Sequence, residues 1–378
     1  MLLSVCILLK DDAPSLRRLT AMVHELADEV VVVCDEPIAD DFQAAADQGR
    51  ARLIPHHWQN NFAAARNAGL EAARGEWIFW IDSDETLIVP DARTFRKLLQ
   101  RQDVLGYYVT IQDEGGAASM SPRQHPSLYR RHEELRYKGR IHEHFVTQME
   151  VVAERCDMKV LSSPIRLTHT GYHPEKRSSK QQRNIAYLEL ELTERPGQLY
   201  YLIELGRMLL LSGQPRGHAV LADAAKVLLR NLRGARAPLP NVAAFLEYAL
   251  SYAPVDFPVS REAAVETALR WFPAIPPLVW LAARWNYQQG KLAEAARLLK
   301  LVLQMGETGS YDAAMSFDQS IFGDETRLNY GVCCAKLGQV ENAIRQFNLI
   351  RAESRFYPLA QQNLKQLQVG RPDTWKNL

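Results

Sequence analysis

The chain lacks a long hydrophobic run: its longest apolar stretch, residues 2–9, is too short to cross a bilayer. No basic segment precedes that stretch, as a secretory signal would require. The sequence also lacks an excess of one charge, since 45 basic residues face 44 acidic ones. A dedicated nucleic-acid or anionic-membrane binder would show a basic excess. We therefore expect a soluble, cytoplasmic protein with no transmembrane segment and no nucleic-acid partner.

Paired cysteines and a glycine-rich phosphate loop are missing as well. The five cysteines are odd in number and form no Cys-x-x-Cys pair, which predicts reduced, small apolar residues. No glycine-rich loop follows the first apolar stretch, which argues against a phosphate-activating nucleotidyltransferase. With 378 residues, the chain exceeds the size at which one hydrophobic core keeps growing, so two domains are expected.

The first third of the chain alternates apolar runs with helical patterns, which indicates βαβ units and a mostly parallel sheet. The runs that predict strands are residues 2–9, 30–33, 52–55 and 77–81. One helix is expected from Pro14 and another after Asn61. The second helix has the small residues Ala65, Gly69 and Ala73 on its apolar stripe, which predicts a close approach to the sheet.

Acidic residues follow the strand expected at residues 77–81, in the order Asp82-Ser83-Asp84-Glu85. In an open α/β sheet, ligands bind beyond the carboxyl ends of the strands. Two carboxylates separated by one small residue can share Mg²⁺ or Mn²⁺, whose other positions water and diphosphate oxygens fill. On these four residues alone, an ordinary turn or a helix cap is an equally good interpretation.

Further motifs follow one another in a fixed order over the first half of the chain. They are Trp58-x-x-Asn61-Phe62-x-x-Ala65-Arg66-Asn67, Gly75-Glu76-Trp77, Tyr129-Arg130-Arg131, Gly139-Arg140-Ile141-His142-Glu143 and His169-Thr170-Gly171-Tyr172. Together with Asp82-x-Asp84, this order resembles the family 2 glycosyltransferases with a GT-A fold, in the branch that carries tetratricopeptide (TPR) repeats behind the catalytic domain. Bacterial peptide S-glycosyltransferases of the sublancin type are similar in layout.

The resemblance implies a Rossmann-like mixed α/β sheet in a catalytic domain of residues 1–177, followed by an all-α TPR-like domain of residues 178–378. It also implies an inverting transfer of sugar from a nucleotide-sugar, with a UDP-sugar as the expected donor. The acceptor is a peptide, protein or glycan.

For the donor, the resemblance points to Lys10, Asp12 and Asp35 as contacts of the base and ribose, with Arg66 and Asn67 near the nucleotide. Two family patterns are altered here. The usual Lys-Asn-Glu is Lys10-Asp11-Asp12, and the usual Asp-x-Gly-Ser after the second strand is Cys34-Asp35-Glu36-Pro37. Either the loop is reshaped or the nucleotide preference has changed.

The resemblance assigns a divalent cation to Asp82 and Asp84, with Asp84 as the direct ligand and Asp82 near the ribose or a metal-bound water. A cation there stabilises the charge that builds on the departing diphosphate. Arg66 suits a phosphate or a pyrimidine carbonyl. Its alternative role is an ion pair with Asp82 or Asp84.

An inverting reaction needs a base for the acceptor, and Glu143 is the first candidate. If residues 140–146 form a strand, His142 and His144 lie on the opposite face from Glu143. Either a histidine, with His144 as the first choice, completes the metal site and Glu143 is structural, or Glu143 is the base and the histidines are core or supporting groups.

Asp113 and Glu114 are rival bases that precede a small, glycine-rich run at residues 115–119. That run could close over the donor or be an ordinary loop.

Basic residues gather before Glu143, at Arg123, Arg130, Arg131, Arg136, Lys138 and Arg140. This local excess fits either a diphosphate site or a solvated hairpin, because alternate strand residues point in opposite directions.

From residue 178 onward the pattern changes to helices with small residues at recurring positions, as in TPR repeats. Gly290 and Gly338 are 48 positions apart rather than 34, which predicts an insertion around residues 309–324. A degenerate helix pair is expected at 242–271. Stacked helix pairs form concave surfaces, so this half fits a protein acceptor, a second copy of the chain, or a simple packing scaffold.

Two functions therefore compete. One is the metal-dependent glycosyltransferase, and the other is a catalytically weak, nucleotide-binding interaction protein whose repeats recruit a protein partner.

Overall fold

The computed structural model describes residues 1–89, 91–113, 120–169, 174–230, 232, 234–313 and 315–369. The chain divides into two compact units, one of residues 1–116 and 122–196, the other of residues 117–121 and 197–378. The boundary expected at residue 178 lies inside helix α6 (Pro174–Glu194), which groups with the first unit.

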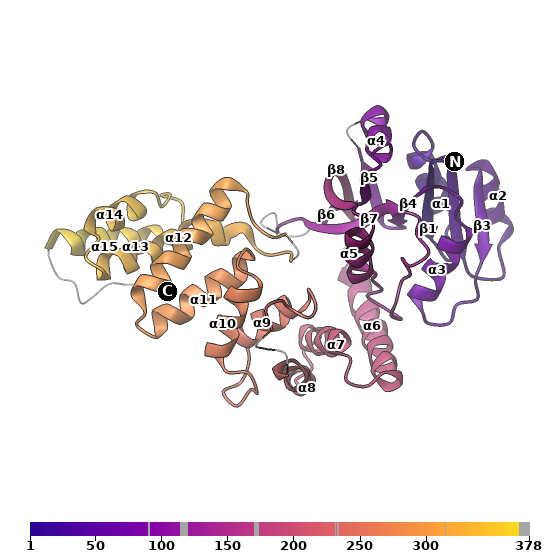
Figure 1. The fold of residues 1–378 in the computed structure, drawn as a ribbon. Helices are drawn as coiled ribbons and strands as arrows, with labels where there is room; N and C mark the ends of the chain where they lie inside the picture. The colour runs from indigo at the N-terminus through magenta and orange to yellow at the C-terminus, as the bar shows by residue number, and fades with distance from the viewer. Residues whose placement is uncertain are drawn as a thin grey trace. The chain divides into compact units, whose positions relative to one another are not determined.

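The first unit is built on an eight-stranded sheet in the order β3-β2-β1-β4-β7-β6-β8-β5. The strands are β1 (Leu3–Leu8), β2 (Glu29–Cys34), β3 (Ala51–Pro55), β4 (Trp77–Asp82), β5 (Glu85–Ile88), β6 (Val104–Asp113), β7 (Arg123–Arg130) and β8 (Lys159–His169). Strands β1 to β4 pair in parallel, whereas β7 pairs antiparallel with β4 and β6, and β5 antiparallel with β8. The expected mixed, Rossmann-like sheet is confirmed, and its parallel half occupies the indigo end of the ribbon (Figure 1).

Helices pack on both faces of this sheet, since successive residues of its strands bury their side chains on opposite sides. The helices of this unit are α1 (Ala13–Val23), α2 (Asp40–Gln48), α3 (Phe62–Ala72), α4 (Ala92–Leu99), α5 (Val146–Arg155) and α6. Val5 and Ile7 of β1 join one core cluster with α1 and α2, while Cys6 joins another with α3 and α5. A Cβ on Gly69 would lie 2.9 Å from the Trp80 ring, which confirms the expected close approach of α3.

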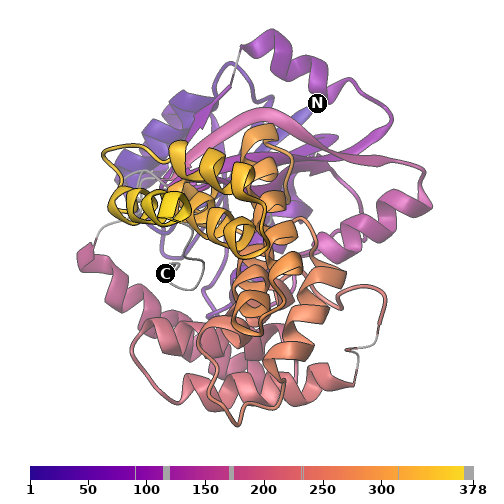
Figure 2. The same cartoon turned by 90° about the vertical axis from the view of Figure 1, so that its left-hand side faces the viewer.

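The second unit consists of helix pairs. Its helices are α7 (Leu199–Leu211), α8 (Gly217–Leu229), α9 (Val242–Ser251), α10 (Arg261–Trp271), α11 (Pro276–Gln288), α12 (Leu292–Thr308), the short 3₁₀ helix η1 (Gln319–Phe322), α13 (Asp324–Lys336), α14 (Val340–Asn348) and α15 (Tyr357–Val369). The orange and yellow helices lie next to each other along their lengths in both views (Figure 1 and Figure 2). The predicted pair at 242–271 is confirmed as α9 and α10, and the insertion as the segment that holds η1.

Glycines mark the turns within three of these pairs. Gly213, Gly290 and Gly338 follow α7, α11 and α13 with φ of 72°, 72° and 74°, the left-handed region that ends a helix most easily with glycine. Small residues also bring paired helices together, because a Cβ on Gly331 of α13 would lie 2.5 Å from the Phe347 ring of α14. Repeated turns and repeated close contacts support the TPR-like interpretation.

The five cysteines are free thiols, as expected, and four of them are buried. No helix in the described ranges combines the length and the apolar character that a membrane crossing needs.

Candidate active site

A cleft of about 720 Å³ opens at the carboxyl ends of β1, β2 and β4. Each of these strands delivers a charged residue to it, namely Lys10 after β1, Asp35 after β2, and Asp82 and Asp84 at the end of β4. Arg66 reaches the cleft from α3. The topology therefore gathers residues that are far apart in the sequence at the sheet edge where α/β proteins bind ligands.

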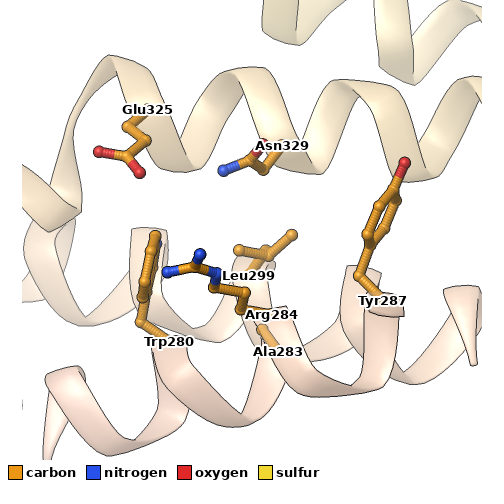
Figure 3. A pocket seen from close by; sticks show the side chains of 7 residues that line it. All are labelled: Trp280, Ala283, Arg284, Tyr287, Leu299, Glu325 and Asn329. Atoms are coloured by element: carbon orange, nitrogen blue, oxygen red, sulfur yellow. The ribbon is translucent and has the colours of Figure 1, made fainter. Parts of the chain in front are cut away.

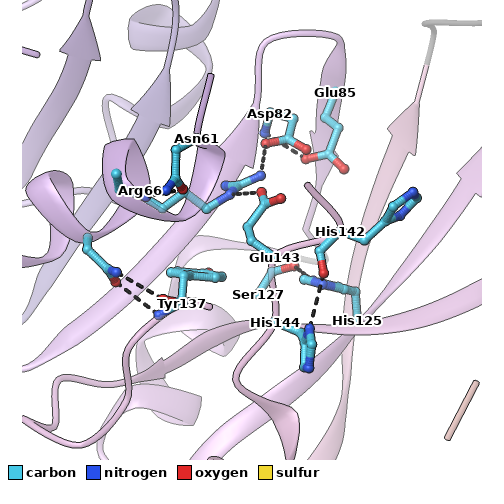
Figure 4. Close-up of polar contacts among 12 residues, drawn as sticks. Asn61, Arg66, Asp82, Glu85, His125, Ser127, Tyr137, His142, Glu143 and His144 are labelled. Carbon is cyan, nitrogen blue, oxygen red and sulfur yellow. Dashed lines mark hydrogen bonds and ion pairs between the residues drawn. The ribbon is translucent and has the colours of Figure 1, made fainter. Parts of the chain in front are cut away.

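Arg66 is held between two carboxylates. Its Nη2 lies 2.8 Å from Asp82 Oδ1 and its Nε 2.5 Å from Glu143 Oε1 (Figure 4). Burial disfavours the charged guanidinium, but Asp82 and Glu143 outweigh burial and hold the pKa of Arg66 well above its usual value. The alternative ion pair between Arg66 and Asp82 is thus present, while the Asp82 side chain stays 49% exposed.

Asp84 contacts His169, the last residue of β8. Its Oδ2 lies 3.2 Å from His169 Nε2 and 3.5 Å from Lys180 Nζ. The hydrogen bond with His169 is the main cause that lowers the pKa of Asp84 to about 2. The same bond raises the pKa of His169, whose Nδ1 lies 2.9 Å from Asp113 Oδ1. Asp84 is therefore an ionised carboxylate beside an imidazole.

Glu85, the last residue of the acidic run, holds the turn at residues 82–85 through a hydrogen bond to the backbone. Its side chain is buried and accepts a hydrogen bond from the backbone N–H of Asp82 at 2.8 Å. Burial, followed by the nearby charge of Asp82, raises the pKa of Glu85 to about 7. This carboxyl group braces the turn that presents Asp82 and Asp84.

The strand considered as one possibility for residues 140–146 is not formed, because His142 adopts a left-handed φ of 52° and the chain turns there. His142 and Glu143 consequently both line the cleft, whereas a strand would have separated them. His144 Nδ1 lies 3.1 Å from the carbonyl of His142, and His144 is not among the described residues that line the cleft (Figure 4).

The placement of His144 in the metal site therefore requires correction, since His169 is the histidine beside Asp84. In the part of the chain that the structure describes, no three His, Cys, Asp or Glu side chains already form a metal cluster.

The predicted donor residues fall into two groups. Lys10 and Asp35 line the cleft, with Lys10 Nζ 3.9 Å from Asp35 Oδ2, and the backbone N–H groups of Glu36 and Trp58 donate to Asp35 Oδ1. These hydrogen bonds, that from Glu36 first, lower the pKa of Asp35.

Asp12 and Asn67 are not among the described residues that line the cleft. Asp12 caps α1 by accepting from the N–H of Ser15 at 3.0 Å, and the Asn67 amide pairs with both backbone groups of Tyr137. The structure gives both residues structural contacts instead.

Of the two rival bases, Asp113 is engaged with His169 and is not among the described residues of the cleft. Glu114 and residues 115–119 lie outside the described residues, as do Thr170, Gly171 and Tyr172 of the last motif.

Most of the basic residues that precede Glu143 make contacts within the protein rather than in the cleft. Arg130, Arg131 and Arg136 donate to backbone carbonyls, and Arg140 pairs with Glu194. Arg123 is the member of this group that the described lining of the cleft includes. The side chains of Arg130 and Arg140 are only 16% and 18% exposed, so these two arginines fit neither a solvated hairpin nor a diphosphate site.

The sequence interpretation missed two contributors to the cleft. One is His169, which stood in a recognised motif without a role. The other is α6, from which Lys180, Arg183, Asn184 and Tyr187 line the cleft. Their spacing of i, i+3, i+4 and i+7 was a readable signal for one helix face, but only the fold shows that this face meets the sheet.

Residues 4–152 match the family model described as Glycosyl transferase family 2. A TPR repeat-containing protein of Synechococcus elongatus is 28% identical over 256 residues, which cover 66% of this chain and 60% of that protein. The SPbeta prophage-derived glycosyltransferase SunS of Bacillus subtilis is 25% identical over 161 residues, 40% of this chain and 36% of SunS. The chain thus spans less than two thirds of the length of these relatives.

Solved structures show more distant likenesses. S. aureus TarS in complex with UDP-GlcNAc aligns over 77% of this chain and 92% of TarS, with 13% identity and a TM-score of 0.40. The mannosyltransferase PcManGT from Pyrobaculum calidifontis aligns over 75% of this chain and 86% of that protein, with 15% identity and a TM-score of 0.37.

Proposed function

We propose that the chain is an inverting glycosyltransferase, because residues 4–152 match the family model described as Glycosyl transferase family 2. It takes a sugar from a nucleotide-sugar, with UDP-sugars as the first donors to test, and passes it to a peptide, protein or glycan acceptor. The observation that carries this proposal is the cleft at the carboxyl ends of β1, β2 and β4, where Asp82 and Asp84 lie beside Arg66 and His169.

The side chains at the end of β4 suit a divalent cation. Asp84 supplies an ionised carboxylate and His169 a neighbouring imidazole, a donor set compatible with Mn²⁺ or Mg²⁺ whose remaining positions a diphosphate would fill. When bound, the cation would supply charge stabilisation to the departing diphosphate. Asp82, half exposed and paired with Arg66, is left to contact the ribose or a metal-bound water.

The nucleoside end of the donor fits the other side of the cleft. The backbone N–H groups of Glu36 and Trp58 hold the Asp35 carboxylate in a fixed position. This carboxylate can accept hydrogen bonds from the ribose hydroxyls. Lys10 lies beside it with a largely exposed side chain. The altered residues after β2 make this the region where nucleotide preference is set.

Glu143 is the proposed base, because it lines the cleft and Asp113 is not among the described residues that do. Arg66 Nε lies 2.5 Å from Glu143 Oε1 and fixes the orientation of this carboxyl group. The base takes the proton of the acceptor while the diphosphate leaves from the opposite face of the sugar.

A second candidate function rests on the helical unit. A pocket of about 110 Å³ between α11, α12 and α13 is lined by Trp280, Arg284 and Tyr287, with Glu325 and Asn329 facing them (Figure 3). Aromatic and arginine side chains are typical anchors of protein interfaces. This surface suits a protein partner or a second copy of the chain. In this second candidate function, the first unit binds a nucleotide without turnover.

Incubation with Mn²⁺ and a panel of nucleotide-sugars distinguishes the two functions. A glycosyltransferase releases nucleoside diphosphate from at least one donor, and Asp84→Asn reduces that rate by about 100-fold or more, since it removes charge at the cation. Asp103→Asn is the matched control, because Asp103 pairs with Arg101 on the surface of the same unit. No release from any donor by the unaltered protein would favour the interaction protein.

A further inference from the structure

Helix α6 presents a row of four side chains to the cleft. Lys180, Arg183, Asn184 and Tyr187 recur at i, i+3, i+4 and i+7, the spacing of one helix face, and all four line the cleft. The helix begins at Pro174, beyond the end of the matched family region at residue 152, and belongs to the same compact unit as the sheet. The cleft therefore includes cations that no family assignment covers.

Contacts within this row and one turn beyond it fix helix α6 against the sheet. The Tyr187 hydroxyl lies 2.9 Å from Asn60 Oδ1, just before α3. Further along, Glu191 is fully buried and accepts from the backbone N–H of Arg140 at 3.1 Å. The guanidinium of Arg183 lies 5.3 Å from the centre of the Phe62 ring. Lys180 and Arg183 are thus held over the cleft by a docked helix.

The basic side chains that line the cleft differ in whether they lie beside a carboxylate. Arg66 forms ion pairs with Asp82 and Glu143, and Lys180 Nζ lies 3.5 Å from Asp84 Oδ2. Arg183 differs, because its contacts among the described residues are the neutral amide of Asn184, with Nη2 3.0 Å from Oδ1, and the Phe62 ring. A guanidinium held at a cleft wall with neutral partners is suited to an anionic ligand.

We propose that Lys180 and Arg183 bind the diphosphate of the donor, an inference that rests on the proposed function. Lys180 stands next to Asp84, where the cation and the diphosphate would meet, and Arg183 lies one helical turn further along the same wall. The planar fork of arginine can bind two phosphate oxygens, whereas lysine contributes a compact point charge.

In this proposal, Lys180 and Arg183 favour cleavage of the bond to the diphosphate as well as binding of the donor. A lone pair of the acceptor forms a bond to the anomeric carbon, and the acceptor's proton passes to the base. The bond between the anomeric carbon and the diphosphate oxygen breaks, with its electron pair left on that oxygen. Negative charge therefore grows on the diphosphate in the transition state, and cations beside it stabilise that state more than the ground state.

The test compares ligands with and without the diphosphate. Titration calorimetry measures UDP and GDP binding in the presence of Mg²⁺, and saturation-transfer NMR measures the corresponding nucleosides, uridine and guanosine. The full-length variants are Lys180→Gln, Arg183→Gln and the charge-preserving Arg183→Lys. Lys159→Gln serves as the matched control, because Lys159 is an exposed cation paired with Asp103 at the start of β8.

We expect each glutamine variant to lose about tenfold or more in nucleoside diphosphate affinity, the usual effect of one charge-assisted hydrogen bond. Nucleoside binding stays unchanged, Arg183→Lys falls between the unaltered protein and Arg183→Gln, and Lys159→Gln has no effect. Unchanged diphosphate affinity in both glutamine variants would overturn the inference, and so would equal losses for nucleosides and diphosphates. If the unaltered protein binds neither diphosphate, the proposed function itself fails.

Discussion

The two units of this chain use charged residues in opposite ways. In the first unit, charged side chains are gathered and largely buried at the cleft, where Arg66 is 13% exposed and Glu143 11%. In the second, each ion pair among the described residues keeps at least one well-exposed partner, as in Arg297 with Glu294 (60% and 39%) and Arg351 with Asp324 (77% and 9%). Glycine and alanine at helix contacts determine its shape instead. The difference shows that the first unit holds partly desolvated charge at a cleft, whereas the second gains its form from close packing.

The largest expected effect comes from removing the central cation of the first unit. Arg66→Met leaves Glu143 in a poorly solvated position without its partner, and we expect a loss of about 3–5 kcal/mol in the free energy of unfolding. Chemical denaturation followed by circular dichroism measures it.

The control for Arg66→Met is Arg101→Met, which breaks the exposed pair with Asp103 and should cost no more than about 1 kcal/mol. The double variant Arg66→Met/Glu143→Gln should recover part of the loss, because it removes the unpaired charge. Equal costs for Arg66→Met and Arg101→Met would remove the contrast between desolvated and surface charge.

The buried carboxyl group of Glu85 should make the stability of the first unit depend on pH. Burial raises its pKa from about 4.5 to about 7 in the folded protein, so folding favours the protonated form. Its contribution is fully present below about pH 4.5 and is lost as pH rises through about 7, a change of about 3 kcal/mol.

Glu85→Gln removes that titration. In metal-free buffer, the difference in free energy of unfolding between the unaltered protein and Glu85→Gln should therefore shift against the unaltered protein between about pH 4.5 and 7. A difference that stays constant over this range would mean that Glu85 is not held in its protonated form.

In the second unit, close packing predicts a smaller effect. A Cβ at position 331 meets the Phe347 ring at 2.5 Å, so Gly331→Ala should destabilise the helical unit by about 1–3 kcal/mol. Gly338→Ala is the comparison, since a Cβ there meets nothing within 4 Å and its left-handed φ costs about 1 kcal/mol. Differential scanning calorimetry measures both, and a larger loss for Gly338→Ala would contradict the packing argument.

Local patterns predicted the parts of the fold that local physics determines. The four apolar runs became β1 to β4, and Asn61 caps α3 by accepting from the N–H of Ala64. The position of Asp82 and Asp84 at a strand end followed from strand polarity, because parallel strands bring their carboxyl ends to one edge. The helix pairs of the second unit followed from recurring small residues.

The remaining features depend on long-range pairing that no local pattern contains. His169 reaches Asp84 because β5 and β8 pair, with Glu85 opposite His169 in the register. The face of α6 meets the cleft through contacts such as Tyr187 with Asn60, 127 positions apart. The strand considered for residues 140–146 is absent because His142 takes a left-handed φ, which is uncommon for a residue other than glycine.

The central claim is that the end of β4 binds a divalent cation together with a nucleotide diphosphate. Crystals of the protein grown with Mn²⁺ and UDP, measured at the manganese absorption edge, test it most directly. We predict an anomalous peak in contact with the Asp84 carboxylate, with the diphosphate beside it. UDP bound in the cleft with manganese located elsewhere, or with no manganese at all, would contradict the claim.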